Sequence, residues 1–161
     1  MVEIRYGQVE DFPACVELAT ELMDSRRGQP FLQVALDRGQ LLVASEGGDV
    51  VGFVVYRTDW FNCTFVSLVV VEPERRRKGI ARALYQAVEA ESLSPRLFSS
   101  TEETNAASIR MHSALGFTAS GYIDNLPQGS RELLFYKRLP SRLGHGRDGV
   151  TILGDQEGSH V

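Results

Sequence analysis

The residues of this chain that point most directly to chemistry lie between Val69 and Arg82. Three valines are followed by a proline-containing turn, four consecutive basic residues at 75–78, and Gly79. The apolar run predicts a buried strand, and the apolar spacing from Ile80 onward predicts a helix. The basic residues and the glycine therefore precede a helix start. Unpaired backbone N–H groups and the positive end of the helix dipole attract anions at such a position.

A pyrophosphate group suits this arrangement. Glycine lets a ligand approach the backbone closely, and arginines form paired hydrogen bonds with phosphate oxygens. The segment has neither the GxxxxGK[ST] sequence of a P-loop nor the three glycines of a dinucleotide fingerprint. A basic run by itself is more often solvated surface, so its position between a strand and a helix is what favours an anion site.

The elements around this segment predict a mixed α+β domain. Strands are expected at 2–6, 41–45, 50–56, 63–71, 97–101, 117–123 and 132–139, and helices at 12–23, 31–36, 80–88 and 105–115. Residues 25–30 are expected to be a polar break, and 58–62 a loop that carries Trp60. We expect one domain over 1–140 and a flexible tail over 141–161.

Composition and charge exclude several classes of protein. A length of 161 residues with 43% hydrophobic and 24% charged residues suits one globular domain. The net charge of -4 disfavours nucleic-acid binding, and no apolar run is long enough to span a membrane. The N-terminus lacks a signal peptide, so a cytoplasmic location is expected. Cys15 and Cys63 lack metal-ligand spacing, so no metal is expected.

Two motifs resemble those of the GNAT family of N-acetyltransferases. Residues 76–81, Arg-Arg-Lys-Gly-Ile-Ala, are similar to its [RQ]-x-x-G-x-[GA] signature. Asn105 and Ser108, followed by Leu-Gly-Phe at 115–117, resemble its later N-x-x-[SA] motif and the turn after it. The motifs occur in the family's order. The resemblance implies a GNAT-like, mostly antiparallel sheet of about seven strands flanked by about four helices.

The resemblance also implies a function. Acetyl-CoA would be the cosubstrate, and its acetyl group would pass directly to a primary amine of a small molecule or peptide. A homodimer is one expected state, because dimers are common among relatives. The alternative is a non-catalytic acyl-CoA-binding or regulatory module. The implied cofactor contacts are the backbone of Val69, Val70 and Val71, the loop residues Arg76, Arg77, Lys78, Gly79, Ile80, Ala81 and Arg82, and the pair Asn105 and Ser108.

The sequence departs from the family at the residues that transfer protons. His112 stands where many members have a tyrosine that protonates the leaving thiolate. It is a candidate general acid, a hydrogen-bonding residue for cofactor or substrate, or an ordinary surface histidine. Ser100 stands where ribosomal-protein alanine acetyltransferases have a glutamate base. Proton removal through water, proton removal by Glu132, and selection of an already neutral amine all remain open.

Two further segments are candidates for the acceptor site, because flanking loops build that site in the family. They are 60–62, which contains Trp60, and 122–125, which contains Tyr122 and Asp124. A carboxylate of Asp124 or Glu132 facing the pocket would favour a cationic amine.

Overall fold

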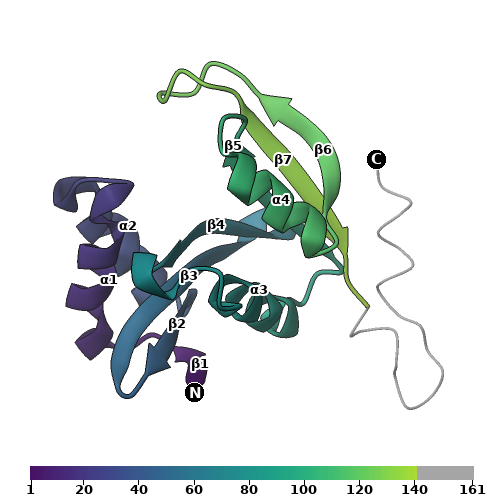
Figure 1. Cartoon of the computed structure of the whole chain (residues 1–161). Coiled ribbons are helices and arrows are strands. Elements are labelled where there is room, and N and C mark those ends of the chain that lie inside the picture. The colour runs from purple at the N-terminus through teal and green to yellow at the C-terminus, as the bar shows by residue number, and fades with distance from the viewer. Residues whose placement is uncertain (141–161) are drawn as a thin grey trace, which may run out of the picture. The chain divides into compact units, whose positions relative to one another are not determined.

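A computed structural model of the chain describes residues 1–140, so the predicted flexible tail at 141–161 lies outside the described residues. Over 1–140 the chain forms a mixed α+β fold with a seven-stranded, mostly antiparallel sheet and four α-helices (Figure 1). The predicted fold class is confirmed. The chain divides into two compact units: unit 1 contains 1–57 and 66–90, and unit 2 contains 58–65 and the chain from Glu91 onward.

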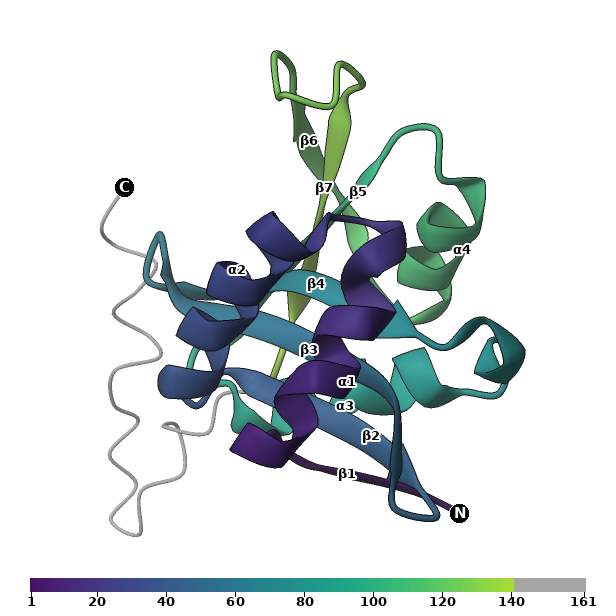
Figure 2. The ribbon, with the colours of Figure 1, turned by 90° about the vertical axis from the view of Figure 1, so that its left-hand side faces the viewer.

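Unit 1 is a layered arrangement of strands and helices. Its strands, in sheet order, are β1 (Val2–Tyr6), β2 (Leu41–Glu46), β3 (Asp49–Trp60) and β4 (Cys63–Val71), with the tips of β3 and β4 assigned to unit 2. Helices α1 (Phe12–Leu18) and α2 (Ser25–Asp37) cover one face of these strands, and α3 (Ile80–Glu91) lies on the other face (Figure 2). Short 3₁₀ turns form at Val9–Asp11, Ala19–Glu21 and Pro73–Arg75.

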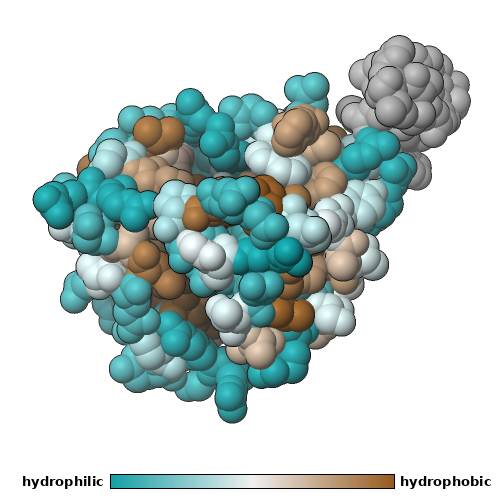
Figure 3. Space-filling view, turned by 90° about the horizontal axis from the view of Figure 1, so that it is seen from above, coloured by the Kyte–Doolittle hydropathy of each residue, from teal (hydrophilic) through white to brown (hydrophobic). Residues whose placement is uncertain are grey.

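The core of unit 1 explains why β2 is apolar along most of its length. β2 is buried at five consecutive positions, as expected for a strand that helices cover on both faces. One cluster joins α1 and α2 to the strands through Cys15, Ala19, Leu32, Ala35, Leu41, Val43, Phe53, Val55 and Val70. On α3 the buried residues are Ile80, Leu84, Tyr85 and Val88, which recur at helical spacing. In the space-filling view, most of the side chains that project outward are hydrophilic, and hydrophobic side chains lie between them (Figure 3).

Two predicted element boundaries in this part of the chain are wrong. The predicted polar break at 25–30 is the first half of α2, which begins after Asp24. The Asp24 carboxylate accepts a hydrogen bond from the Arg27 backbone N–H at 3.1 Å, and this cap starts the helix despite its polar first turns. The predicted loop at 58–62 is mostly strand, because β3 continues to Trp60 and turns only at Phe61 and Asn62, both with positive φ.

Unit 2 contains the strands β5 (Arg96–Glu102), β6 (Thr118–Ile123) and β7 (Glu132–Arg138), in the sheet order β5-β7-β6. Both strand pairs are antiparallel, and Glu102 lies opposite Glu132 in the β5–β7 register. Helix α4 (Ala106–Ala114) lies along one face of these strands (Figure 1). No helix within residues 1–140 has the length and apolar character needed to span a membrane.

His112 anchors α4 to the sheet of unit 2. The residue is 1% exposed, and its ring stacks on Phe135 with 4.4 Å between ring centroids. Its Nδ1 lies 2.8 Å from the carbonyl oxygen of Ser108, and its Nε2 lies 2.8 Å from the Ser99 hydroxyl. A carbonyl can only accept, so Nδ1 carries the proton and the Ser99 hydroxyl donates to Nε2. The ring is therefore held as a neutral imidazole, because burial lowers the pKa of His112 more than the Ser108 bond raises it.

This arrangement predicts that protein stability depends on pH through His112. With a folded pKa below the unfolded value of about 6.5, His112 takes up a proton when the protein unfolds at mildly acidic pH. The free energy of unfolding should therefore fall as the pH drops below that value and be insensitive to this group above it. The variant His112→Phe should lack this component and should also lose about 1–3 kcal/mol, because Ser99 and the Ser108 carbonyl lose a buried partner. Urea unfolding of both proteins at pH 5.5, 6.5 and 8 measures the free energy of unfolding of each. A difference between the two proteins that stays the same at all three pH values would contradict the prediction.

Candidate functional site

The end of β4 is the rigid part of the predicted anion site in unit 1. Val70 and Val71 are 6% and 9% exposed, and Val69 is half-buried. Strand β3 holds this end through the Glu72 backbone N–H, which donates to the Val51 carbonyl at 2.8 Å. Gly52 permits the close approach of the two strands, since a Cβ at this position would lie 2.9 Å from the Val70 carbonyl oxygen. The backbone that precedes the basic loop is therefore well fixed.

The structure divides the four consecutive basic residues into two groups. Arg75 forms ion pairs with Glu46 and with Glu72, the latter at 3.6 Å. Arg76 donates from Nε to the Val71 carbonyl oxygen at 3.1 Å, and its terminal nitrogen pairs with Glu21 at 3.3 Å. Both side chains thus have acidic partners within unit 1. Of the two, only Arg76 is among the predicted cofactor residues, and its guanidinium is turned toward Glu21.

The second group comprises the cations that remain available to a ligand. Arg77 and Lys78 are exposed, and so is Arg82 on the first turn of α3. None of the three side chains has a hydrogen bond or an ion pair with any residue in the range 1–140. Three exposed positive charges therefore surround the start of α3. The hydrogen bond from Arg75 lowers the pKa of Glu46 and the charge of Lys78 adds to this effect. No carboxylate of residues 1–140, however, forms an ion pair with any of the three cations.

The backbone of the loop is shaped for a tight turn into α3. Gly79 has a φ of 82° and Arg77 a φ of 65°, so two of three successive residues are left-handed. The Gly79 carbonyl accepts from the Ala83 N–H at 3.0 Å, which makes Gly79 the residue that caps the helix. The N–H groups of Ile80, Ala81 and Arg82 begin the helix and have no intrahelical acceptor. Turns of alternating handedness that open a helix present such N–H groups to anions. Nothing in the sequence indicated a left-handed arginine at 77.

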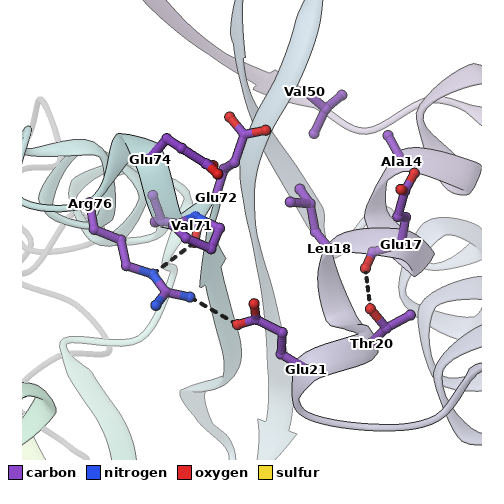
Figure 4. Close-up of a pocket in the computed structure, with 11 residues that line it drawn as sticks. Ala14, Glu17, Leu18, Thr20, Glu21, Val50, Val71, Glu72, Glu74 and Arg76 are labelled. Atoms are coloured by element: carbon purple, nitrogen blue, oxygen red, sulfur yellow. Dashed lines mark hydrogen bonds and ion pairs between the residues drawn. The ribbon is translucent and has the colours of Figure 1, made fainter.

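A cleft of about 360 Å³ lies next to this loop within unit 1 (Figure 4). Arg76 and the residues before it form one wall, and the end of α1 and the turn after it form the other. Glu72 and Glu74 come from the first wall and Glu17 and Glu21 from the second, so four carboxylates line the cleft with one arginine. Glu17 and Glu21 were not predicted, because nothing in their local sequence links them to a segment 55 residues further along.

In unit 2 the structure brings Asn105 and Ser108 together at the start of α4. The Asn105 side-chain oxygen accepts from the Ser108 backbone N–H at 3.0 Å, which caps the helix. The Ser108 hydroxyl lies 3.4 Å from Nδ1 of His112. His112 is therefore not the ordinary surface histidine that was one interpretation of the sequence. Its candidate roles as an acid or as a hydrogen-bonding residue stay predictions.

Glu132 and Ser100 form a second polar pair in unit 2. The Ser100 hydroxyl donates to Oε2 of Glu132 at 2.7 Å, and the Gln128 amide donates to Oε1 at 3.3 Å. Both side chains are half-buried. β7 therefore supplies a carboxylate that reaches across to the Ser100 position on β5. The sequence named both residues but did not indicate that they are in contact.

The other acidic candidate in unit 2 has a basic partner. Asp124 pairs with Arg131 at 3.0 Å, and the guanidinium of Arg131 lies 3.7 Å above the centre of the Tyr122 ring. The Asp124 hydrogen bond raises the pKa of Arg131, so the arginine stays charged and compensates the carboxylate. Asp124 is therefore less suited than Glu132 to attract a cationic ligand.

The cysteines do not form an obvious nucleophile. Cys15 is completely buried, and burial raises the pKa of its thiol to about 12. The half-buried Cys63 thiol donates to the Phe61 carbonyl at 3.4 Å. Within residues 1–140, His, Cys, Asp and Glu side chains form no group of three that could hold a metal ion.

Comparisons with known proteins agree with these features. The sequence matches the family model described as the acetyltransferase (GNAT) family over residues 4–117, more than half of the chain. No curated protein matches the sequence. One similar solved structure is a GNAT-family acetyltransferase from Bacillus cereus, with 30% sequence identity over 87% of this chain and 99% of that chain and a TM-score of 0.80. A second is the YncA protein from Salmonella typhimurium with its cofactor acetyl-CoA, with 23% identity over 86% of this chain and 94% of that chain and a TM-score of 0.70. A third is the ribosomal-protein-S18-alanine N-acetyltransferase from Escherichia coli, with 18% identity over 86% of this chain and 94% of that chain and a TM-score of 0.74.

The last two likenesses, both below 25% identity, support the fold alone, whereas the family match and the Bacillus cereus structure support membership. With the glycine-capped basic loop after β4 and the asparagine-capped α4, these matches show that the chain belongs to the GNAT family of acetyltransferases.

Proposed function

We propose that this protein transfers the acetyl group of acetyl-CoA directly to a primary amine of a small molecule or peptide. The observation that carries the proposal is the loop after β4, where Arg77 and Lys78 have no acidic partner and Gly79 caps α3. The family uses acetyl-CoA, and a diphosphate needs the features that this loop supplies. The cytoplasmic location and the homodimer stay predictions.

Each group of predicted cofactor residues has a distinct task in this proposal. Arg77, Lys78 and Arg82 neutralise the diphosphate, and the N–H groups of 80–82 donate hydrogen bonds to it. The backbone of Val69, Val70 and Val71 binds the pantetheine amides as an added strand would, and one of its N–H groups polarises the thioester carbonyl. Arg76 acts indirectly, because its bond to the Val71 carbonyl holds the loop against the strand. Asn105 and Ser108 are the proposed contacts from unit 2.

The acetyl-CoA thioester supplies an activated acetyl group, so the protein's remaining tasks are to orient an amine and to move protons. Glu132 is the proposed base, because its carboxylate is half-buried and held by Ser100 and Gln128. It takes a proton from the ammonium group of the acceptor, whose neutral nitrogen then attacks the acetyl carbon. The carbon–sulfur bond of the thioester breaks as the amide forms, coenzyme A leaves as the thiolate, and the second proton that the nitrogen loses neutralises that thiolate.

We propose that His112 acts indirectly by positioning α4, because it is buried on the face of β5 opposite to the one that Glu132 contacts. Both ring nitrogens have partners within unit 2, and the neutral ring must gain a proton before it can give one. If His112 acts as the acid, His112→Phe should change the pH dependence of kcat. An unaltered profile would leave it as the residue that anchors α4.

The first test of the proposal concerns Gly79. The variant Gly79→Glu should lose at least tenfold in affinity for acetyl-CoA, because a negative charge and a strained positive φ would enter the phosphate site. Gly129→Glu is a matched control, since Gly129 has the same φ of 82° and equally open space around its Cβ position. Isothermal titration of acetyl-CoA measures both affinities. Unchanged binding in Gly79→Glu would refute the assignment of this loop.

The second test uses the division of the basic run. Replacing Arg77 and Lys78 together by glutamine should weaken acetyl-CoA binding by about tenfold or more, because each loses a charge-assisted bond to phosphate. Arg75→Gln should change the affinity little, since Arg75 is already paired with Glu46 and Glu72. The same titration at two salt concentrations should show a weaker salt dependence for the double variant only. Equal effects of both changes would contradict the division.

The third test separates an enzyme from the alternative, a non-catalytic acyl-CoA-binding module. Thiol release from acetyl-CoA should appear when primary amines are supplied, and Glu132→Gln should lower kcat by about 10²–10⁴-fold, as expected for loss of a general base. Binding of acetyl-CoA to that variant should be unchanged. Glu102→Gln is the control, because Glu102 lies opposite Glu132 in the sheet but is exposed. Acetyl-CoA binding without thiol release from any amine would favour the module.

A further inference from the structure

Four aromatic side chains form a half-buried group on one face of unit 2. Trp60 stacks on Phe65 with 4.8 Å between ring centroids and an interplanar angle of 19°, and it lies 5.0 Å from Phe98. Phe98 in turn lies 5.2 Å from Tyr136, its partner in the β5–β7 register. We call these residues, Trp60, Phe65, Phe98 and Tyr136, the aromatic platform. All four are partly exposed to solvent.

The platform lies on the face of β5 that α4 does not cover. Side chains alternate along a strand, so Phe98 and Ser100 point to one face and Leu97, Ser99 and Thr101 to the other. The buried Ser99 bonds to His112 of α4, which identifies the second face as the one that this helix covers. α4 is the only α-helix that lies wholly within the described part of unit 2. The apolar core under it is separate from the platform.

A carboxylate stands beside the platform on the same face. Ser100 follows Phe98 by two residues, which places it about 7 Å further along β5. The Ser100 hydroxyl binds the Glu132 carboxylate, and Glu102 lies opposite Glu132 in the register. The face therefore changes over a short distance from aromatic rings to negative charge. No basic residue contacts Glu132 among residues 1–140.

The platform also has unused polar groups. The indole N–H of Trp60 and the hydroxyl of Tyr136 have no hydrogen-bond partner within the described part of the chain. Indole and phenol groups combine an apolar ring with a polar end, and on a partly exposed face both parts can contact a ligand. Aromatic rings also attract organic cations through their faces. An ammonium group joined to an apolar ring is complementary to this face in both charge and shape.

We propose that the acceptor is a primary amine that carries an aromatic ring two or three carbons from its nitrogen. The ring stacks on the aromatic platform, and the ammonium group binds Glu132. The Glu132 carboxylate reaches Ser100, which is the next side chain after Phe98 on this face, and this spacing of about 7 Å sets the length of the linker. This proposal rests on the proposed acetyl transfer and adds the class of acceptor. A free arylalkylamine and a peptide with an N-terminal phenylalanine share this chemistry.

Relative activities toward a small set of amines test the proposal. Thiol release from acetyl-CoA is measured with 2-phenylethylamine, with ethylamine, which lacks the ring, and with 1,4-diaminobutane, which has a second charge instead. We expect kcat/KM for 2-phenylethylamine to exceed both others by at least about tenfold. A dipeptide with N-terminal phenylalanine is included, and whichever aromatic amine is faster identifies the source. Equal rates with the three simple amines would overturn the aromatic specificity but leave acetyl transfer intact, whereas no thiol release from any amine would overturn both.

Variants of the platform complete the test. Trp60→Ala should reduce the preference for the aromatic amine to less than about threefold, and Trp60→Phe should retain most of it because a ring remains. Tyr6→Ala removes a half-exposed aromatic residue from unit 1 and should leave the preference unchanged. Sedimentation of the same variants examines the other use of such a face, contact with a second copy of the chain. A Trp60→Ala protein that loses self-association but keeps its preference among amines would overturn the proposal.

Discussion

Competition for positive charge is the constraint on which the rest of this structure depends. A basic run binds a diphosphate only if the protein's own carboxylates leave some of its cations free, and this protein divides the run in two. Arg75 and Arg76 hold the loop through Glu46, Glu72, Glu21 and the Val71 carbonyl, while Arg77 and Lys78 face solvent. The paired arginines give the turn its shape, and the unpaired cations give it a charge for a ligand to neutralise. Gly79 then brings the first N–H groups of α3 to the same turn.

The polar residues of unit 2 are arranged by the two faces of one strand. On the face of β5 that α4 covers, Ser99 meets a buried neutral histidine, and the result is a firm attachment of the helix. On the opposite face, Ser100 contacts Glu132, and the aromatic platform lies at Phe98, two residues earlier on the strand. Two adjacent serines thus have unlike environments because the side chains of a strand alternate. The same alternation keeps His112 and Glu132 on opposite faces of these strands.

These environments also bear on proton transfer. A carboxylate that accepts two hydrogen bonds and contacts no basic residue in the described chain can accept a proton from a bound ammonium group. A buried imidazole with both nitrogens engaged is better suited to position a helix. The proposed base lies on β7, and its carboxylate reaches across to Ser100 on the neighbouring strand β5.

The sequence by itself determined the order of strands and helices, the family motifs and the turn at Gly79, because each is encoded by residues close together in the chain. It missed the first half of α2 and the end of β3, where a side-chain cap and continued strand pairing override a polar local pattern. Only the tertiary structure decided which cations stay free, since the acids that pair with Arg75 and Arg76 lie 29 and 55 residues away. It likewise joined Ser100 to Glu132 across 32 residues and assembled the aromatic platform from β3, β4, β5 and β7. These contacts depend on the register between strands, which is set by packing of the whole sheet. The local hydrophobic periodicity of a strand does not determine which residue of another strand lies opposite it.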